Sequence, residues 1–317
     1  MSPPADNPLR VLIGEGEYRR YAALLHEQAP ELEVYGSDQL VELQQAPTCP
    51  VWLGQPDLLA ALLRQGVRPQ WMQSTWAGIT PLLATGLPAD YRLSRAVGIF
   101  GQVMAEYVLG HLLAHERQLF ARLAAQVEQR WDNRAPQSLA GRTALIVGTG
   151  DIGLSVARFL APFGIQLLGI ASSLRNLPPF RQVAGLDELP SLAAEADYLI
   201  NLLPDTPATR DIYDSALFAA CKSSALFINA GRGVAVVDQA LVSALQQGQL
   251  AGAVIDVCRA EPLPAGHPFW DAPRLLLTGH SAAPTDPCLL VQLFVDNLQR
   301  WQAGETVLGQ VDFTRGY

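Results

Sequence analysis

The stretch Gly148-Thr149-Gly150-Asp151-Ile152-Gly153 decides the fold class of this chain. It follows an apolar, β-branched run, Thr143–Val147, and opens a segment, Asp151–Phe163, whose apolar residues recur at helical spacing. A G-x-G-x-x-G run between a strand and a helix is typical of a dinucleotide-binding turn, and the same letters elsewhere carry little weight. The alternative is a turn that only joins a strand to a helix.

Each glycine of this run has a role in such a turn. Gly148 permits the tight bend, Gly150 lets the backbone approach a pyrophosphate, and Gly153 lets the helix lie close to the strand. Backbone N–H groups at the start of the helix would then hold the diphosphate. We therefore predict that all six residues bind the cofactor: Gly148, Thr149, Gly150, Asp151, Ile152 and Gly153.

The choice of cofactor is read from the end of the next predicted strand. NAD-binding turns carry an acid there, about 20 residues after the motif begins, which binds the ribose 2′-hydroxyl. The window 168–175 holds no acid and instead offers Ser172, Ser173 and Arg175, which suit a 2′-phosphate. The sequence thus predicts NADP(H) as the preferred cofactor and NAD(H) as a second one. The alternative for Arg175 is a solvated loop charge.

Two blocks of alternating strand and helix patterns surround this motif, and alternation of this kind predicts parallel sheets in an α/β fold. We expect strands at 10–14, 31–35, 51–54, 71–74 and 92–94, then at 143–147, 165–171, 198–202, 225–229, 253–256 and 275–277. Helices are expected at 17–28, 57–64 and 288–301. A single long helix from Gly101 to about Arg130 would bridge the two blocks.

Three ionisable residues stand next to predicted strand ends in the second block: Arg232, Glu261 and His280. The carboxyl ends of parallel strands face the ligand crevice of an open sheet, so these side chains are expected to converge there. Each also has a plainer alternative. Arg232 could be a surface arginine, Glu261 a turn residue before Pro262, and His280 a histidine that only completes a strand end.

The combined motifs resemble the D-2-hydroxyacid dehydrogenase family, most of all its glyoxylate/hydroxypyruvate reductase branch. The resemblance spans nearly the whole chain and lies in Gly148–Gly153, Asn229–Gly233, Asp256–Leu263, Gly279–Ala282 and the helix that begins Gly101-Gln102-Val103-Met104-Ala105-Glu106-Tyr107. It implies reduction of a small 2-keto acid to its D-2-hydroxy acid. It departs from the family at Thr80, where an acid is common, and at Arg175, which stands a few residues from the usual arginine position.

The resemblance also assigns roles to single residues. His280 would be the general acid, Glu261 its carboxylate partner, and Arg232 the group that binds the substrate carboxylate. Asp256 would orient the nicotinamide carboxamide, with a strand-end cap as the alternative. The main-chain N–H groups of Ala77 and Gly78 would meet the substrate carboxylate. The pocket aromatics would be Trp52 and Trp76, for which a core position is the alternative.

Two α/β domains follow from the resemblance: a doubly wound Rossmann-type cofactor domain and a flavodoxin-like substrate domain. We expect the substrate domain at 1–99, completed by a C-terminal helix at 283–317, and the dinucleotide-binding domain at 100–282. A homodimer is implied as well, with the helix from Gly101 as its contact. Some relatives are dinucleotide-responsive corepressors, so a sensor module with little turnover is the competing interpretation.

Composition excludes other classes of protein. A net charge of −8 argues against a nucleic-acid partner. No apolar run approaches the ~18 residues of a membrane span, and the start, residues 1–8, lacks an apolar leader, so a cytoplasmic protein is expected. No metal site is predicted, because the cysteines form no C-x-x-C pair and His111 and His115 have no third ligand. Ser281 is followed by no histidine, which excludes a hydrolase triad.

Overall fold

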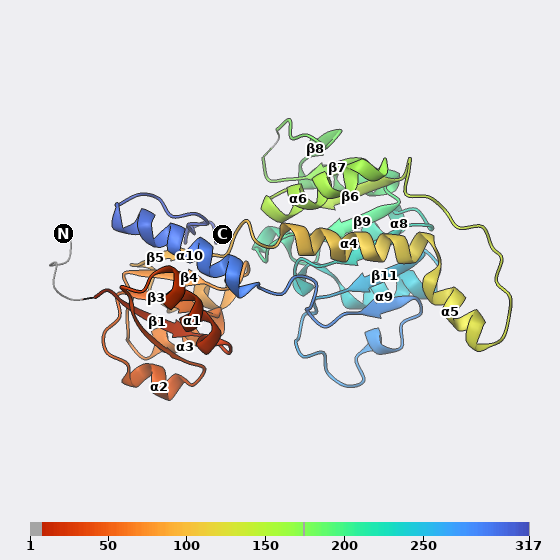
Figure 1. Cartoon of the computed structure of the whole chain (residues 1–317). Helices are drawn as coiled ribbons and strands as arrows, with labels where there is room; N and C mark the ends of the chain where they lie inside the picture. The colour runs from red at the N-terminus through yellow and green to blue at the C-terminus, as the bar shows by residue number, and fades with distance from the viewer. Residues whose placement is uncertain (1–7, 174, 317) are drawn as a thin grey trace. The chain divides into compact units, whose positions relative to one another are not determined.

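The computed structural model describes residues 8–173 and 175–316 (Figure 1). Residues 1–7, which hold most of the start expected to lack a leader, lie outside the described residues, as do Leu174 and Tyr317. The chain forms two compact units: one contains Met1–Ile99 and Thr285–Tyr317, and the other contains Phe100–Pro284. Among the described helices, none combines the length and the apolar character needed to cross a membrane.

The first unit is built on a five-stranded parallel sheet in the order β2-β1-β3-β4-β5. This is the flavodoxin-like order, in which the direction of winding reverses between β1 and β3. The strands are short and apolar, and β3 and β4 are buried along their whole length. Their bounds are Arg10–Gly14 (β1), Glu33–Ser37 (β2), Val51–Gly54 (β3), Trp71–Ser74 (β4) and Arg92–Ser94 (β5).

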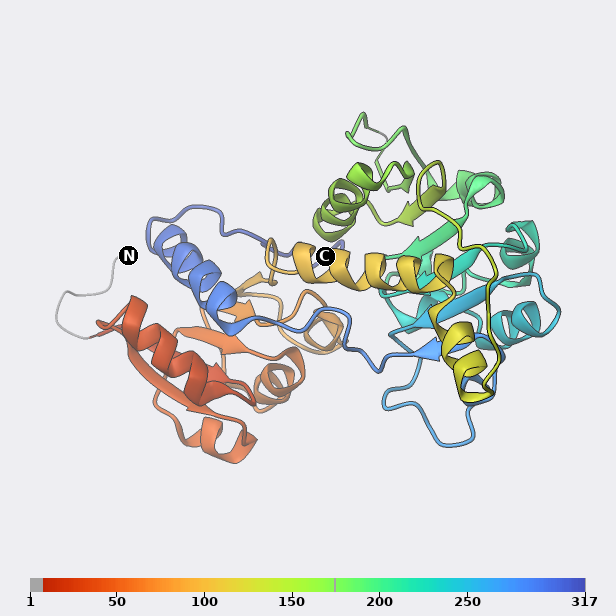
Figure 2. The same cartoon turned by 45° about the vertical axis from the view of Figure 1, so that its right-hand side comes forward.

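Helices complete this unit, and one of them comes from the far end of the chain. The helix α10 (Pro287–Gln302) lies beside α1 (Tyr18–Gln28), and its Phe294 ring stacks on Trp71 of β4 with 5.1 Å between centroids (Figures 1 and 2). The other helices are α2 (Leu40–Gln45) and α3 (Pro56–Arg64). The C-terminal helix therefore packs with the N-terminal block through a buried aromatic contact.

The second unit holds a seven-stranded parallel sheet in the order β12-β11-β10-β9-β6-β7-β8. The order reverses beside β6, the strand before the glycine turn, as in dinucleotide-binding doubly wound sheets. This confirms the predicted fold class. The strands are Thr143–Val147 (β6), Gln166–Ile170 (β7), Gln182–Ala184 (β8), Tyr198–Asn201 (β9), Leu226–Asn229 (β10), Gly252–Ile255 (β11) and Leu275–Leu277 (β12).

Successive side chains of a strand point to opposite faces of the sheet. Both faces of this sheet are apolar, and helices cover both. On β6, Leu145 and Val147 join one apolar cluster, and Ala144 and Ile146 join the other. The first cluster packs against α7 (Leu189–Glu195), α8 (Ser215–Ala220) and α9 (Asp238–Gln246). The second packs against α4 (Gly101–Glu116) and α6 (Asp151–Leu160).

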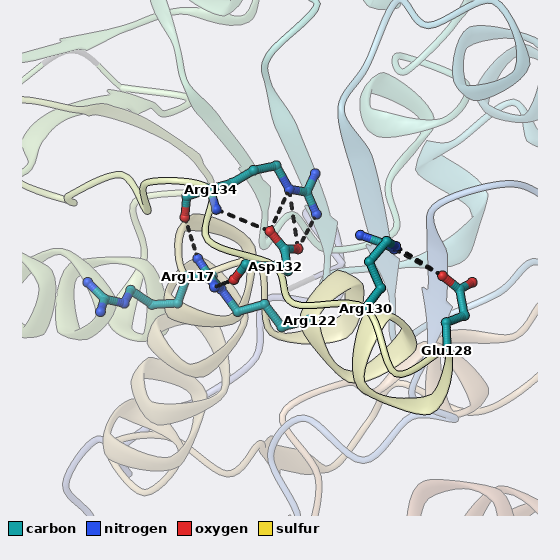
Figure 3. A network of polar contacts seen from close by, with 6 residues as sticks. All are labelled: Arg117, Arg122, Glu128, Arg130, Asp132 and Arg134. Atoms are coloured by element: carbon teal, nitrogen blue, oxygen red, sulfur yellow. Dashed lines mark hydrogen bonds and ion pairs between the residues drawn. The ribbon is translucent and has the colours of Figure 1, made fainter.

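The single long helix expected from Gly101 to about Arg130 is wrong: two helices, α4 and α5 (Leu119–Val127), replace it. Between them Gln118 adopts a left-handed backbone with φ of +54°. Arg122 stabilises the break, since its guanidinium donates to the carbonyls of Arg117 at 3.0 Å, Asp132 at 2.8 Å and Arg134 at 2.6 Å (Figure 3). These side-chain contacts bring together segments that the local apolar pattern cannot relate.

Candidate active site

Two of the three glycines in this turn occupy positions where a residue with a Cβ does not fit. Gly148 has φ of +107°, and a Cβ there would lie 2.9 Å from the Leu202 carbonyl carbon. A Cβ at Gly153 would lie 2.0 Å from the carbonyl oxygen of Gly148. At Gly150, by contrast, no atom lies within 4 Å of the Cβ position. The first and last glycines therefore permit close backbone packing, and the middle one leaves its flank open to a ligand.

Hydrogen-bond donors are available at this turn. The first N–H groups of α6, from Asp151 onward, have no carbonyl partner within the helix. The Thr149 hydroxyl is buried and has no hydrogen-bond partner among the described residues, while its N–H donates to the Ile170 carbonyl at 3.2 Å. A helix N-terminus, an open glycine flank and a spare hydroxyl together fit the diphosphate of a dinucleotide.

The residues predicted to select the cofactor follow β7. Ser172 and Ser173 are exposed in the loop after this strand. Arg175 is also exposed, and its Nη2 donates to the Thr149 carbonyl at 3.2 Å. Arg175 therefore lies against the glycine turn and does not extend freely into solvent. This position places a permanent positive charge beside the predicted ribose site.

Glu261 and His280 meet in the loops after β11 and β12. The Nδ1 of His280 lies 2.7 Å from Oε2 of Glu261, and Oε1 of Glu261 accepts the Cys258 N–H at 2.8 Å. The His280 side chain keeps 54% of its surface exposed, so its ring remains accessible. Because the carboxylate orients Nδ1, Nε2 is left for a ligand.

The backbone at His280 is held in a left-handed conformation with φ of +58°, which a residue with a Cβ seldom adopts. Asp256 holds this loop in place. Its carbonyl accepts the His280 N–H at 2.6 Å, and its Oδ1 accepts the Ser281 N–H at 2.9 Å. It also accepts the Ala282 N–H at 3.2 Å. These contacts match the strand-end cap that was the alternative for Asp256, and its contact with nicotinamide stays a prediction.

This hydrogen-bond network includes two further residues that the sequence analysis did not identify. Thr278 donates from its hydroxyl to Oδ1 of Asp256 at 2.6 Å, so the Tyr107 hydroxyl, 2.9 Å from Thr278 Oγ1, is the donor in their contact. Burial raises the pKa of Tyr107, which keeps this hydroxyl protonated. Tyr107 closes the helical motif that begins at Gly101, but the motif assigns it no role, and only the fold brings α4 to the end of β12.

Arg232 stands in the loop after β10, the neighbour of β11 in the sheet. A buried asparagine pair supports this loop: Asn201 donates to Asn229 Oδ1 at 2.8 Å, and Asn229 donates to the Arg232 carbonyl at 3.3 Å. The sequence signal that could have identified this pair is the asparagine that ends each of two apolar strands. Arg232, Glu261 and His280 thus follow three adjacent strands, β10, β11 and β12, at one edge of the sheet.

Cys258 lies beside Glu261, and its thiol is partly buried. Burial, and then the nearby carboxylates, raise the pKa of its thiol to about 11. The thiol is therefore mostly protonated near pH 7, which disfavours a nucleophilic role for Cys258.

The candidate substrate residues of the first unit differ in their surroundings. Trp52 is fully buried in the core of that unit, and its Nε1 donates to the Cys49 carbonyl at 3.0 Å. The structure therefore favours the core alternative for Trp52. Trp76 is 39% exposed in the loop after β4. In the same loop the N–H groups of Ala77 and Gly78 donate to no group within the described chain.

Known proteins resemble this chain in sequence. Residues 109–282 match the family model described as D-isomer specific 2-hydroxyacid dehydrogenase, NAD binding domain. A glyoxylate/hydroxypyruvate reductase A of Yersinia enterocolitica is 36% identical over 214 residues, which cover 68% of each chain.

Solved structures extend the similarity to both units. A D-isomer specific 2-hydroxyacid dehydrogenase family protein of Aeromonas salmonicida has a TM-score of 0.91 and 35% identity, covering 97% of this chain and 100% of its own. An NADPH-dependent glyoxylate/hydroxypyruvate reductase of Sinorhizobium meliloti, solved with NADP and sulfate, has a TM-score of 0.85 and 29% identity, covering 98% and 100%.

Proposed function

The chain belongs to the D-isomer specific 2-hydroxyacid dehydrogenase family, and within it we propose that the protein reduces glyoxylate, hydroxypyruvate or a keto acid of similar size to the D-2-hydroxy acid, using NADPH. Membership makes the protein a nicotinamide-dependent oxidoreductase that acts on 2-keto and 2-hydroxy acids. The names of the relatives support the small substrates. The substrate itself is the part that we propose.

One observation carries the proposal: the Glu261–His280 pair, 2.7 Å apart, lies in the loops after β11 and β12, and Arg232 lies in the loop after the adjacent strand β10. An acid and a fixed positive charge at one sheet edge suit a substrate that needs a proton on its carbonyl and an ion partner for its carboxylate. Both groups follow strands of the sheet that carries the glycine turn.

The residues of this chain would act as follows. A nicotinamide cofactor, when bound, supplies the hydride. Arg232 binds the keto-acid carboxylate with its planar, permanently charged fork. His280 gives the proton to the carbonyl oxygen, and Glu261 holds the ring through Nδ1 so that Nε2 faces the substrate. Asp256 keeps the His280 loop in its left-handed conformation. Positioned proton transfer contributes about 10²–10⁴ in rate.

We assign the cofactor contacts to the glycine turn and to Ser172, Ser173 and Arg175. Support for NADPH over NADH comes from the arginine against the turn, from the absence of an acid in 168–175, and from the relative solved with NADP. In the first unit, Trp76 and the N–H groups of Ala77 and Gly78 are assigned to the substrate. Trp52 is left out because its side chain has no exposed surface.

We also propose that the protein is a homodimer. The helix α5 projects from its unit with exposed apolar side chains, including Phe120 and Leu123, and Trp131 beyond it is 91% exposed (Figure 1). Such a surface is costly to leave in water, and a second copy of the chain would cover it. Sedimentation of the wild type and of Leu123→Glu tests this. A wild-type monomer at micromolar concentration would contradict the dimer.

A substrate panel tests the proposed reaction. Glyoxylate, hydroxypyruvate, pyruvate and a bulky aromatic keto acid are each assayed with NADPH and with NADH, by the fall in absorbance of the reduced cofactor. We expect the highest kcat/KM for glyoxylate or hydroxypyruvate with NADPH, and a D-configured product where the product is chiral. Cofactor binding without turnover of any keto acid in the panel would overturn the proposal.

A further inference from the structure

Arg259 lies two residues before Glu261, but its side chain makes its contacts with a different loop. Its Nε donates to the Val236 carbonyl at 3.1 Å, and its Nη2 donates to the Val234 carbonyl at 3.1 Å. The same guanidinium pairs with the Asp211 carboxylate, and Asp238 lies 3.9 Å away. Both carbonyls belong to the segment that begins directly after Arg232.

The backbones of these two loops also touch. A Cβ at Gly233 would lie 2.0 Å from the Cys258 carbonyl carbon and 2.5 Å from the Arg259 nitrogen. No side chain fits at that point, so the Arg232 loop rests directly on the Cys258–Arg259 backbone. The short 3₁₀ helix Gly233–Ala235 has Arg232 as its N-cap residue. The start of this turn is therefore fixed against the loop after β11.

The other end of the same loop carries Glu261, the carboxylate partner of the predicted acid His280. The Cys258 N–H donates to one oxygen of Glu261 at 2.8 Å, and the other oxygen lies 2.7 Å from His280. The segment 258–261 thus contacts the Arg232 loop on one side and the His280 ring on the other. A shift of this segment would change the distance between the guanidinium of Arg232 and the imidazole of His280.

Only arginine can make this set of contacts. Its planar fork has five N–H donors in fixed geometry and can bind two carbonyls and a carboxylate at once, whereas lysine offers a single charged point. Asp211 has φ of +57°, and its own N–H donates to the Val234 carbonyl at 3.0 Å. The ion pair with Arg259 and this hydrogen bond hold Asp211 in an unfavourable backbone conformation.

We propose that Arg259 is a positioning residue, which fastens the loop that carries Glu261 to the loop that carries Arg232 and so sets the geometry between the substrate's ion partner and the general acid. The proposal rests on the proposed function of Arg232, Glu261 and His280. It adds a residue that touches neither substrate nor cofactor in that scheme.

The test is a double-mutant cycle on kcat, measured with glyoxylate and NADPH in the full chain. We expect Arg259→Ala to lower kcat by about 10²-fold through misplacement of the acid. Arg259→Lys, which keeps the charge but not the fork, should recover only part of this loss. The affinity for NADPH, measured by fluorescence, should stay within about twofold, because the glycine turn lies on a different loop. Arg181→Ala is the matched control, since Arg181 makes exposed contacts with Gln166 and Glu195.

The decisive comparison uses His280→Gln as the background. If Arg259 acts through the Glu261–His280 pair, Arg259→Ala costs little further kcat once His280 is gone. An equal loss in both backgrounds, or wild-type kcat in Arg259→Ala, overturns the positioning role. If His280→Gln itself keeps the wild-type kcat, the proposed function fails instead. Should Arg259→Ala not fold, Asp211→Asn, which removes the ion partner, should lower kcat in the same His280-dependent way.

Discussion

His280 Nδ1 and Glu261 Oε2 lie 2.7 Å apart, although 19 residues separate them in the chain. The contact joins loops that follow adjacent parallel strands, β11 and β12. It fixes one ring nitrogen and leaves the other for a reacting group. The pair therefore has the geometry that the proposed acid needs, and its removal is the most direct test of the proposal.

Replacement of His280 by glutamine should lower kcat by at least about 10²-fold while NADPH affinity stays near normal, because the proton donor is lost and the glycine turn is untouched. Steady-state kinetics and a fluorescence titration measure the two effects. His26→Gln, on the exposed face of α1, is the matched control. A variant with unchanged kcat would refute the acid role.

Replacement of Arg232 by alanine should raise the KM for the keto acid by about 10- to 100-fold, because a charge-assisted pair with the substrate carboxylate is lost. Added guanidinium ion should restore part of the activity. Saturation curves for glyoxylate measure the change. If the KM stays at its wild-type value, the carboxylate is bound elsewhere.

The cofactor preference should depend on Arg175. In Arg175→Ala we expect kcat/KM for NADPH to fall about tenfold and that for NADH to change little, because only NADPH offers a 2′-phosphate to the guanidinium. The ratio of the two constants is the measurement. A wild-type protein that favours NADH tenfold would rule out the assignment.

The two tryptophans should respond oppositely to substitution. Trp52→Phe should lower the free energy of unfolding by about 1–3 kcal/mol, because the buried Cys49 carbonyl loses its partner, with little effect on KM. Trp76→Ala should raise the KM and change stability by about 0.5 kcal/mol or less, since the residue is 39% exposed and lies in a loop outside the core. Chemical denaturation and saturation kinetics separate the two. A large KM effect of Trp52→Phe would contradict its core role.

Glu15 should make stability depend on pH. Burial raises the pKa of its carboxyl, although the Thr75 hydroxyl, whose oxygen lies 2.6 Å from Oε2, opposes the shift. A raised folded-state pKa means that stability is complete below the unfolded pKa and is lost as pH rises through the folded value. Glu15→Gln should therefore melt at a higher temperature than the wild type near neutral pH.

The difference in melting temperature should vanish near about pH 4, where both side chains are neutral. Thermal melts from pH 4 to pH 8 measure it, with the exposed Glu27→Gln as control. A difference that is constant over this range would show that charge at Glu15 is not its cause.

The local sequence pattern was sufficient to predict the strands that are buried on both faces and the turn positions where only glycine fits. The buried strands 51–54, 71–74 and 143–147 have the bounds that their apolar runs predict, and so does the half-buried strand 275–277. The local pattern failed where contacts outside a helix decide its end. The helix from Gly101 ends at Glu116 because Arg122 and a left-handed Gln118 turn the chain. The helix α2, with 6 residues, and the strand β8, with 3 residues, are too short for a hydrophobic period to be recognised.

By itself the sequence determined the fold class, the glycine turn between a strand and a helix, and the placement of Arg232, Glu261 and His280 after strand ends, because parallel strands bring their carboxyl ends to one edge and only glycine tolerates the contacts at 148 and 153. The tertiary structure alone decided which partners the other candidate residues have. It buried Trp52, turned Asp256 toward the His280 loop and sent Arg259 across to the Arg232 loop, since a side chain's partners are set by neighbours that are distant in the chain.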